Sequence, residues 1–465
     1  MSFDMSKFKL FLIFFLTVFI ISIANKDLYA ATYYVSPTGS ASWSQSQNKN
    51  SPASLTTAMA SAAAGDTVYF RGGTYRLPKV NPDGSGLKPA VFPAHNGQLN
   101  KEIVFKAYSG ETPFFDNSAN QGSSNTVPSY GTFGNSYIIW DGINTKAVPD
   151  TNQTGRGVSI ASNSSNVVLR NASIEGYQSG ISNNNCIRIE HANNILIENC
   201  KIWNANSRTG ADHNCSGIEL YYGQGVTVRK CDIFNCYTGV YDKKAATRNK
   251  YYQNHLYNLQ KGFLICGKWE SADNVEIFKN VIRNCSVWGV ELFDAVNGGN
   301  LANAKIYNNT FYNNAGNAFT GDDGNEFGTE FYNNIVYGAS TAVRFYKTPS
   351  FVDYNSYFKV SKLSYGTTYT SAAAWSSGTA YDKHSLSQDP KLENAGGASP
   401  SGYMPQSGSP CIGAGRNGQT IGAFANASDN LIVGYRAGGS SGGSSGGSSP
   451  TDPLQSPQNL RIVSN

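Results

Sequence analysis

Two neighbouring lysines and a later group of aspartates are the residues whose types and spacing most directly suggest chemistry: Lys243, Lys244, Asp294, Asp322 and Asp323. An amine beside another positive charge loses its proton more readily, so one lysine could act as a general base. Adjacent carboxylates supply the oxygen ligands that Ca²⁺ prefers, and bound Ca²⁺ neutralises the carboxylate of a substrate. Together these groups predict a Ca²⁺-assisted β-elimination, in which a base removes the proton beside the carboxylate of a uronic acid polymer.

Further candidate residues lie close to these groups in the sequence. Lys268 is a third candidate catalytic cation, and nearby aromatic rings could offer flat faces to sugar rings. The candidate substrate-binding residues are Tyr221, Tyr222, Arg248, Trp269 and His213. Glycoside hydrolysis is an alternative chemistry, and it needs two carboxylates on either side of the bond that breaks. The candidate pairs for it are Asp322 with Asp323 and Glu291 with Asp294.

The element that must position these residues is a repeat of about 25 residues, a period typical of solenoid proteins. Strand-like segments with alternating inward and outward side chains begin at Asn166, Asn194, Gly225, Asn249, Asn274, Asn303 and Gly328. A second series between them begins at Gly217, Gly239, Gly262, Gly289, Asn317 and Ala342. Two strand series advancing at one period predict an all-β chain coiled as a parallel β-helix, with neighbouring turns about 4.8 Å apart.

The repeat also predicts which residues lie above one another. Counting along the second series gives one column on the outer surface: Tyr222, Lys244, Gly267, Asp294, Asp322 and Lys347. A ladder of stacked amides is expected at Asn199, Asn254, Asn308 and Asn333. Cys200 and Cys231 should be stacked neighbours, either as buried thiols or as a disulfide. Asp242 falls where other turns place an inward apolar residue, so we expect it to be buried and paired.

The N-terminal segment reads as an export signal. Lys7 and Lys9 precede an apolar run, and Ala30 is a suitable last residue before cleavage, so residues 1–30 are predicted to be a signal peptide. We therefore expect a secreted, extracellular protein with no membrane attachment after signal removal. Residues 31–80 should form a cap on the first turn, with a helix from Ser54 to Ala64, because an open end would expose the core and a strand edge.

The remaining organisation follows from composition. We expect a β-helix domain over residues 31–436, with an irregular C-terminal end over 351–425. Residues 437–449 read as a Gly/Ser linker, and 450–465 as a tail or the truncated start of a fibronectin III-like module. The net charge of +5 is small and the basic residues do not cluster, which argues against nucleic acid as a partner. A polysaccharide is the expected partner, and the protein is expected to be a monomer.

Particular motifs resemble a known group of proteins. They begin at Tyr33 (Tyr-Tyr-Val-Ser-Pro-Thr-Gly), Gly65 (Gly-Asp-Thr-Val-Tyr-Phe-Arg-Gly-Gly-Thr-Tyr), Ile103 (Ile-Val-Phe-Lys-Ala-Tyr-Ser-Gly-Glu-Thr-Pro) and Gly408 (Gly-Ser-Pro-Cys-Ile-Gly-Ala-Gly). Over about residues 32–425 the chain resembles secreted bacterial right-handed parallel β-helix proteins, among them the pectate lyases of polysaccharide lyase family 9. This resemblance implies a right-handed coil and a lyase acting on a pectate-like or alginate-like polymer.

The catalytic layout is also loosely similar to that of polysaccharide lyase family 6. There a lysine base precedes an Asn-led strand, as Lys243 or Lys244 precedes Asn249 and Lys268 precedes Asn274. Because the same fold hosts hydrolases, epimerases and non-catalytic proteins, an adhesin or carbohydrate-binding surface protein is the main alternative. An enzyme requires the lysines and carboxylates to converge in one groove, whereas a binding or structural protein would keep them apart.

Overall fold

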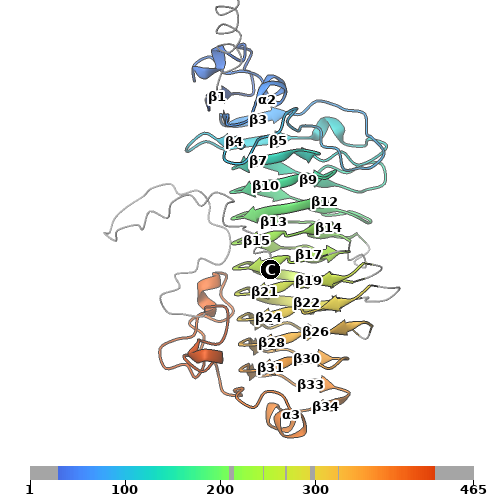
Figure 1. The fold of residues 1–465 in the computed structure, drawn as a ribbon, viewed down its shortest axis with the longest axis vertical. Helices are drawn as coiled ribbons and strands as arrows, with labels where there is room; N and C mark the ends of the chain where they lie inside the picture. Colours follow the sequence, from blue (N-terminus) through green and yellow to red (C-terminus); the bar gives the residue numbers. More distant parts are fainter. Residues whose placement is uncertain are drawn as a thin grey trace, which may run out of the picture.

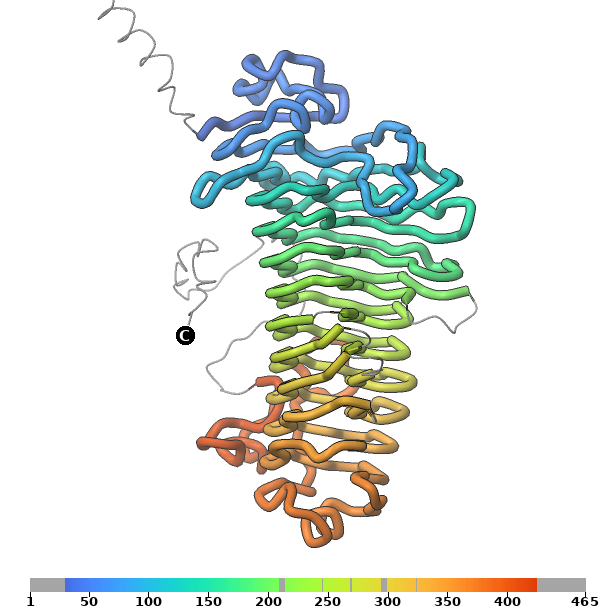
Figure 2. Tube along the Cα trace, turned by 45° about the vertical axis from the view of Figure 1, so that its right-hand side comes forward, coloured from blue at the N-terminus to red at the C-terminus, as the bar shows by residue number. Residues whose placement is uncertain are grey.

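The computed structural model describes residues 30–208, 214–244, 246–267, 270–293, 299–322 and 324–424. These residues form one long coil whose turns stack along a single axis (Figures 1 and 2). Strands of successive turns pair in parallel, and the coil has three walls. The linker and the fibronectin-like tail predicted for residues 437–465 lie outside the described residues.

The first wall carries the first predicted strand series. Its strands are β1 (Thr32–Val35), β2 (Thr67–Phe70), β4 (Ile103–Ala107), β7 (Ser136–Asp141), β10 (Ser165–Arg170), the end of β12 (Asn185–Glu198), β15 (Thr227–Arg229), β18 (Lys250–Tyr252), β21 (Glu276–Phe278), β24 (Lys305–Tyr307), β28 (Glu330–Tyr332) and β31 (Phe351–Asp353).

The second wall follows around the coil. Its strands are β3 (Gly73–Arg76), β5 (Pro113–Asp116), β8 (Asn144–Lys146), β11 (Ser173–Glu175), β13 (Lys201–Trp203), β16 (Asp232–Phe234), the starts of β19 (His255–Cys266) and β22 (Val281–Phe293), β25 (Thr310–Tyr312), β29 (Ile335–Tyr337) and β32 (Ser356–Phe358).

The third wall carries the second predicted series. Its strands are β6 (Tyr130–Phe133), β9 (Arg156–Ala161), the start of β12, β14 (Ser216–Gln224), β17 (Thr238–Lys243), the ends of β19 and β22, β26 (Asn317–Thr320), β30 (Thr341–Phe345) and β33 (Lys362–Tyr365). A small separate sheet joins β20 (Ala272–Asp273), β23 (Leu301–Ala302) and β27 (Glu326–Phe327), and β34 (Thr367–Tyr369) pairs antiparallel with β33.

Apolar side chains fill the interior because each strand points alternate residues inward. Ile218, Val240 and Phe263 occupy the same register in successive turns and are fully buried. The corners between walls need residues in the left-handed backbone region, which Asn and Gly adopt most readily. The corner before the first wall has a positive φ at Asn166, Asn194, Gly225, Arg248, Asn274, Asn303 and Gly328.

The predicted repeat starts are confirmed with two single-residue errors. Thr227 pairs with Lys250, so Arg248, and not Asn249, occupies the corner position. In the second series Val290 pairs with Phe319, which places Ala318, and not Asn317, in register with Gly289. In both places an asparagine lies next to the true position. It was predicted as the start because asparagine is the residue type expected at a corner.

The predicted amide ladder exists but has different members. Its buried side chains are Asn254, Asn280, Asn309, Asn334 and Asn355. In each step the side-chain N–H₂ donates to the Oδ1 of the next asparagine, at 3.0 to 3.3 Å. Of the predicted residues only Asn254 belongs to it. Asn199, Asn308 and Asn333 stand one position earlier, in a neighbouring column of left-handed corner residues.

The N-terminal helix α2 (Leu55–Ser61) begins where the sequence predicted but is shorter. The Ser54 hydroxyl accepts a hydrogen bond from the Thr57 N–H, which satisfies one of the free N–H groups of the first helical turn. Leu55, Ala58 and Met59 pack into the main core. The helix lies at the N-terminal end of the coil (Figure 1).

The C-terminal part of the chain closes the end of the coil and also packs along its side. Helix α3 (Ala372–Gly378) places Trp375 in the main core at the last turn. The chain then runs back along the outside, including the short 3₁₀ helices η3 (Pro400–Tyr403) and η4 (Arg416–Gly418), and packs on Val281 and Ile335 of the second wall (Figure 2). The irregular segment therefore covers one flank as well as one end.

Cys200 and Cys231 are in the same register of neighbouring turns, as predicted, and both are buried free thiols. Among the described residues there is no helix long and apolar enough to cross a membrane.

Candidate active site

The two predicted lysines converge on one aromatic ring at the end of the third wall. Lys243 Nζ lies 5.6 Å from the centroid of the Tyr221 ring, and Lys244 Nζ lies 4.6 Å from it. Tyr221 pairs with Lys243 across β14 and β17, which fixes these side chains on adjacent turns. Tyr222 and Lys244 follow them with positive φ, so each strand turns outward at this point. The sequence therefore predicted correctly that this pair and both tyrosines come together.

Contacts around the lysines hold each ammonium differently. Lys243 Nζ lies 5.2 Å from the Tyr241 ring centroid and donates a hydrogen bond to Asn214 Oδ1 at 3.3 Å. Lys244 Nζ lies 5.3 Å from the Tyr222 ring centroid and donates to its hydroxyl at 3.4 Å. Burial lowers the pKa of Lys244, but hydrogen bonds with Tyr221 and Tyr222 outweigh this effect and the net shift is upward. Lys244 therefore stays charged, contrary to the idea that it might be the base.

A buried ion cluster that the sequence reasoning missed supports the Tyr221 ring from the preceding turn. Arg188 Nη1 lies 2.6 Å from Glu219 Oε1, and its Nη2 lies 2.6 Å from Glu190 Oε2. The Arg188 guanidinium carbon sits 5.2 Å from the Tyr221 ring centroid. Asn185 donates a further hydrogen bond to Glu219 Oε2 at 2.8 Å. Arg188 thus pairs with both carboxylates, and these three side chains together carry one net negative charge beside the Tyr221 ring.

The repeat in the sequence already indicated that this ion cluster could form. Arg188 and Glu219 occupy the same outward register position of β12 and β14. Opposite charges on adjacent turns at one outward column predict an ion pair. His191 was also missed: its ring stacks on Tyr222 with centroids 4.5 Å apart, and it shares a left-handed corner column with Tyr222 and Lys244.

A second group of charges lies further along the third wall. Lys261 Nζ is 2.8 Å from Glu291 Oε2 and 4.3 Å from the Trp288 ring centroid. Burial raises the pKa of Glu291 to about 7, although Lys261 opposes the shift. Glu326 likewise has its pKa raised to about 7 by burial, while it accepts hydrogen bonds from the Asp322 N–H and the Thr329 hydroxyl. Two carboxyl groups here can hold a proton near neutral pH.

Asp242 points into the coil behind the lysine pair. Its Oδ2 accepts hydrogen bonds from Asn249 Nδ2 at 2.9 Å and from the Tyr251 hydroxyl at 2.5 Å. Its Oδ1 finds no hydrogen-bond partner among the described residues. Burial raises the pKa of Asp242 to about 7. The expected burial and pairing of this residue are confirmed, and its place inside the wall makes it a structural neighbour of the lysines.

The other predicted site residues are not all brought together. Arg248 is exposed at the corner before the first wall, where its N–H donates to the Asp273 carbonyl. The predicted column is wrong at Asp322. Glu291 pairs with Thr320, which shifts the register by one residue from the predicted one, so Asp322 lies one position before the column. Asp322 itself is buried beside Glu326. The remaining predicted residues lie outside the described residues: His213, Lys268, Trp269, Asp294 and Asp323.

The expected Ca²⁺ site is not seen among the described residues. They contain no group of three or more His, Cys, Asp or Glu side chains placed to hold a metal ion. The carboxylates nearest the predicted position are already used, Glu291 by Lys261 and Glu326 by the Asp322 N–H. Ca²⁺ takes six to eight oxygen ligands, which the described groups alone do not supply. The Ca²⁺ site at Asp294, Asp322 and Asp323 stays a prediction.

Comparison with known protein families places the chain. Residues 33–320 match the model of the Pel9A-like, right-handed beta helix region. The chain belongs to the Pel9A-like right-handed β-helix family. This membership confirms the predicted all-β, right-handed parallel β-helix and the resemblance on which it was partly based.

Solved structures agree with this family at the level of fold. Pectate lyase Pel9A has a TM-score of 0.60 and 15% identity, covering 85% of this chain and 96% of that chain. XylC in complex with xylose has a TM-score of 0.47 and 12% identity, covering 78% and 87%. A GH136 lacto-N-biosidase from Eubacterium ramulus has a TM-score of 0.42 and 12% identity, covering 71% and 65%. The last two similarities are too low to argue from. None of the curated proteins compared with the chain matches it.

Proposed function

We propose that this Pel9A-like protein is a lyase that cleaves an acidic polysaccharide, with Lys243 as the base and Lys244 as the cation that binds the uronate carboxylate. The observation that carries the proposal is the convergence of both ammonium groups on the Tyr221 ring. Convergence of two cations on one ring is a feature that favours an enzyme over a surface protein with scattered charges. The raised pKa of Lys244 suits a residue that must remain positive while it pairs with a carboxylate.

The chemistry would proceed in one elimination. Neutralisation of the carboxylate at C5 makes the C5 proton more acidic, and Lys243 Nζ in its neutral form removes it. The electron pair left at C5 forms the C4=C5 double bond, and the C4–O glycosidic bond breaks. The departing oxygen stays on C1 of the neighbouring sugar and takes a proton, which gives one fragment with a new reducing end and one fragment with a 4,5-unsaturated uronate at its non-reducing end. The rings of Tyr221 and Tyr222 would orient the sugar beside the lysines.

Pectate-like and alginate-like polymers are the proposed substrate classes, because both carry a carboxylate at C5. The similarity to pectate lyase Pel9A supports the first. Ca²⁺ bound near Asp322 would supply further positive charge, and export from the cell would bring the protein to such polymers. The Ca²⁺ site and the export are both part of the proposal. Chelation tests the Ca²⁺ site, and locating the protein in culture fractions tests the export.

The test is an assay for unsaturated uronates. The protein is incubated with polygalacturonate, pectin, alginate and glycosaminoglycans, each with Ca²⁺ or with a chelator, and the ultraviolet absorbance of the double bond is followed. A rise on one polymer supports the lyase, and its loss with chelator supports Ca²⁺. A folded protein that gives no rise on any of these polymers contradicts the lyase assignment for them.

A second candidate function is glycoside hydrolysis, favoured by one observation. Glu291 has its pKa raised to about 7 in a buried site, as a general acid requires, and the charge of Asp322, which lies beside Glu326, contributes to that rise. Hydrolysis would release reducing ends without ultraviolet absorbance. Measuring both products in the same reaction separates the two functions, and Glu291→Gln should abolish only the hydrolytic one.

A further inference from the structure

The first described residues of the chain are held by a buried carboxylate at the start of the coil. Asp66 is 4% exposed, and its Oδ1 accepts the Ala31 N–H at 3.4 Å. Its Oδ2 accepts the Ala63 N–H at 3.0 Å, and the Ala31 carbonyl accepts the Thr67 N–H at 2.8 Å. In the described part of the chain the partners of this carboxylate are these two backbone N–H groups. A buried anion held only by neutral donors is poorly compensated.

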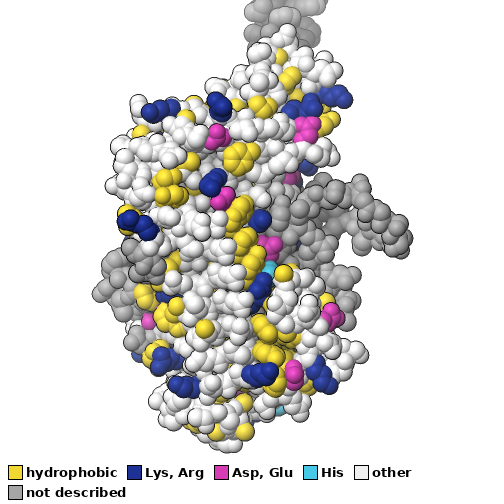
Figure 3. All heavy atoms as spheres, turned by 180° about the vertical axis from the view of Figure 1, so that it is seen from behind, with side chains coloured by type: hydrophobic (Ala, Val, Ile, Leu, Met, Phe, Trp, Pro, Cys, Tyr) yellow, Lys and Arg dark blue, Asp and Glu magenta, His cyan; other side chains and the backbone are white. Residues whose placement is uncertain are grey.

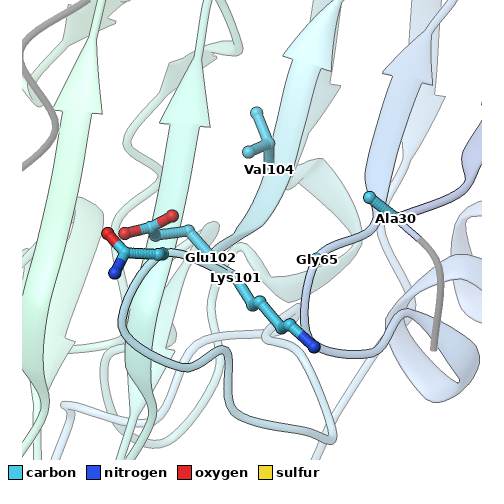
Figure 4. Close-up of a pocket in the computed structure, with 6 residues that line it drawn as sticks. Ala30, Gly65, Lys101, Glu102 and Val104 are labelled. Atoms are coloured by element: carbon cyan, nitrogen blue, oxygen red, sulfur yellow. The ribbon is translucent and has the colours of Figure 1, made fainter. Parts of the chain in front are cut away.

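The bond before Ala31 is accessible. Ala30 is exposed and lines a cavity of about 300 Å³ together with Gly65, Lys101 and Glu102. Figure 4 shows Ala30 at one side of this cavity beside Gly65, with the Glu102 carboxylate at the opposite side. The Ala31 nitrogen is therefore hydrogen-bonded to a buried carboxylate, while the residue before it lines an open cavity.

The sequence before this point has the form of an export signal: lysines, an apolar run, and a small residue at position 30. We propose that a signal-peptide-cleaving protease cuts the bond between Ala30 and Ala31, and that the new α-ammonium group of Ala31 forms an ion pair with Asp66. Water is the co-reactant: its oxygen joins the Ala30 carbonyl carbon, the C–N bond breaks, and the Ala31 nitrogen gains protons to become an ammonium. Asp66 thereby acquires the positive partner that the uncut chain does not give it.

Processing would then complete the N-terminal cap as well as remove the signal. An ion-paired hydrogen bond replaces one in which only the acceptor is charged, which strengthens the tie between β1 and β2 where the first turn begins. The pairing raises the pKa of the α-amino group above its unfolded value of about 8. The stability it adds is therefore fully present below about pH 8 and is lost as pH rises through the higher folded value.

The experiment compares two forms of the full chain from Ala31 to Asn465. One begins at Ala31 with a free α-amino group, and the other carries a six-residue Gly-Ser extension, which leaves a neutral amide at Ala31. At pH 7 we expect the free form to melt about 2 °C higher, and the difference to vanish near pH 11. Equal melting temperatures at pH 7, or a difference unchanged at high pH, would overturn the proposal.

Two variants identify the partner. In Asp66→Asn the difference between the free and the extended form should disappear, even though both forms lose some stability. In Glu102→Gln, an acid of the same cavity whose carboxylate faces away from Ala30, the difference should persist (Figure 4). A difference that survives Asp66→Asn contradicts the pairing. Mass spectrometry of the exported protein should find Ala31 as its first residue, and a different first residue would overturn the processing site.

Discussion

The first and third walls of the coil are both built from parallel strands that repeat once per turn, but they carry very different outer surfaces. On the first wall the outward residues repeat from turn to turn: the rings of Tyr252, Phe278, Tyr307 and Tyr332 stack with centroids 4.8 to 5.1 Å apart. Beside them Lys250 pairs with Glu276 at 2.9 Å, and Lys305 with Glu330 at 3.6 Å. On the third wall one outward column changes residue type at every turn: Arg188, Glu219, Tyr241, Leu264, Glu291 and Thr320.

This difference separates structure from function. A residue stacked on its own kind is satisfied by its neighbours in the ladder, so its contribution is to hold turns together. A column without repetition gains nothing from the stacking of like residues. Here Arg188 of the column lies against the Tyr221 ring together with Lys243 and Lys244. Mixed charges also occur elsewhere: on the face in Figure 3 basic and acidic side chains are interspersed rather than gathered. Convergence, and not charge alone, marks the candidate site.

The largest expected effect belongs to the third wall. Lys243→Ala should lower kcat on the acidic polymer by about 10³-fold, because a general base is lost, while the melting temperature changes little. Lys244→Ala should lower kcat and raise KM together, because the cation both binds the carboxylate and makes the C5 proton more acidic. Initial rates over a range of polymer concentration measure both effects.

Lys250→Ala on the first wall is the matched control, since it removes an exposed lysine that pairs with Glu276. It should leave kcat and KM within about twofold, because exposed ion pairs contribute little. If Lys243→Ala and Lys250→Ala behave alike, the contrast between the walls has no catalytic meaning.

The amide ladder between the first and second walls should respond in stability alone. Asn280→Ala removes the acceptor for Asn254 and the donor to Asn309, and it leaves buried polar groups without partners. We expect a loss of about 3 kcal/mol in the free energy of unfolding, measured by urea denaturation, with unchanged kcat. Asn274→Gly, at an exposed corner, should cost less than about 0.5 kcal/mol. Equal losses from the two would show that the ladder does not stabilise the coil.

Asp242 lies buried inside the third wall, behind the two lysines. Its pKa rises from 3.8 to about 7 on folding, so the folded state keeps its proton longer than the unfolded state. Stability therefore falls as pH increases from about 4 to 7. Asp242→Asn can still accept the hydrogen bonds from Asn249 and Tyr251, so it should flatten this slope and add about 2 kcal/mol at pH 8. An unchanged pH dependence would mean that Asp242 titrates normally.

The smallest effect is expected on the aromatic ladder of the first wall. Tyr307→Leu removes one ring between Phe278 and Tyr332 and a hydrogen bond to Glu276. It should lower the free energy of unfolding by about 1 kcal/mol and leave activity unaffected. A loss of activity here would show that the first wall also binds the polymer.

The fold was largely predictable from the sequence because the interior demands the same residue class at each turn. The register was harder wherever two asparagines are adjacent, as at Asn308–Asn309 and Asn333–Asn334. Only one of each pair points inward, and composition does not tell which. The register was also mispredicted at Arg248, because there a long basic side chain occupies a corner that usually takes Asn or Gly.

The site was predictable in part. The lysines and tyrosines lie within one or two residues of the strand ends that the repeat defines, so counting along the chain brought them together. Arg188 was missed because its contact with Glu219 joins two turns and becomes visible only when the turns are aligned, and its contact with Glu190 lies within β12. The upward pKa shift of Lys244 depends on two hydroxyl groups whose positions only the folded chain sets.

The amide ladder also gives the coil a polarity. Every side-chain N–H₂ from Asn254 to Asn355 donates toward the C-terminal end, and the last one donates to the buried carboxylate of Asp382. The amide dipoles therefore add head to tail over roughly 19 Å, with the positive end at an anion. Turning one amide around would set two donors face to face, so all five must share one orientation. Backbone contacts set this orientation at every turn, because each Oδ1 accepts a backbone N–H and each Nδ2 donates to a backbone carbonyl, and the carboxylate at the last turn completes the chain of dipoles.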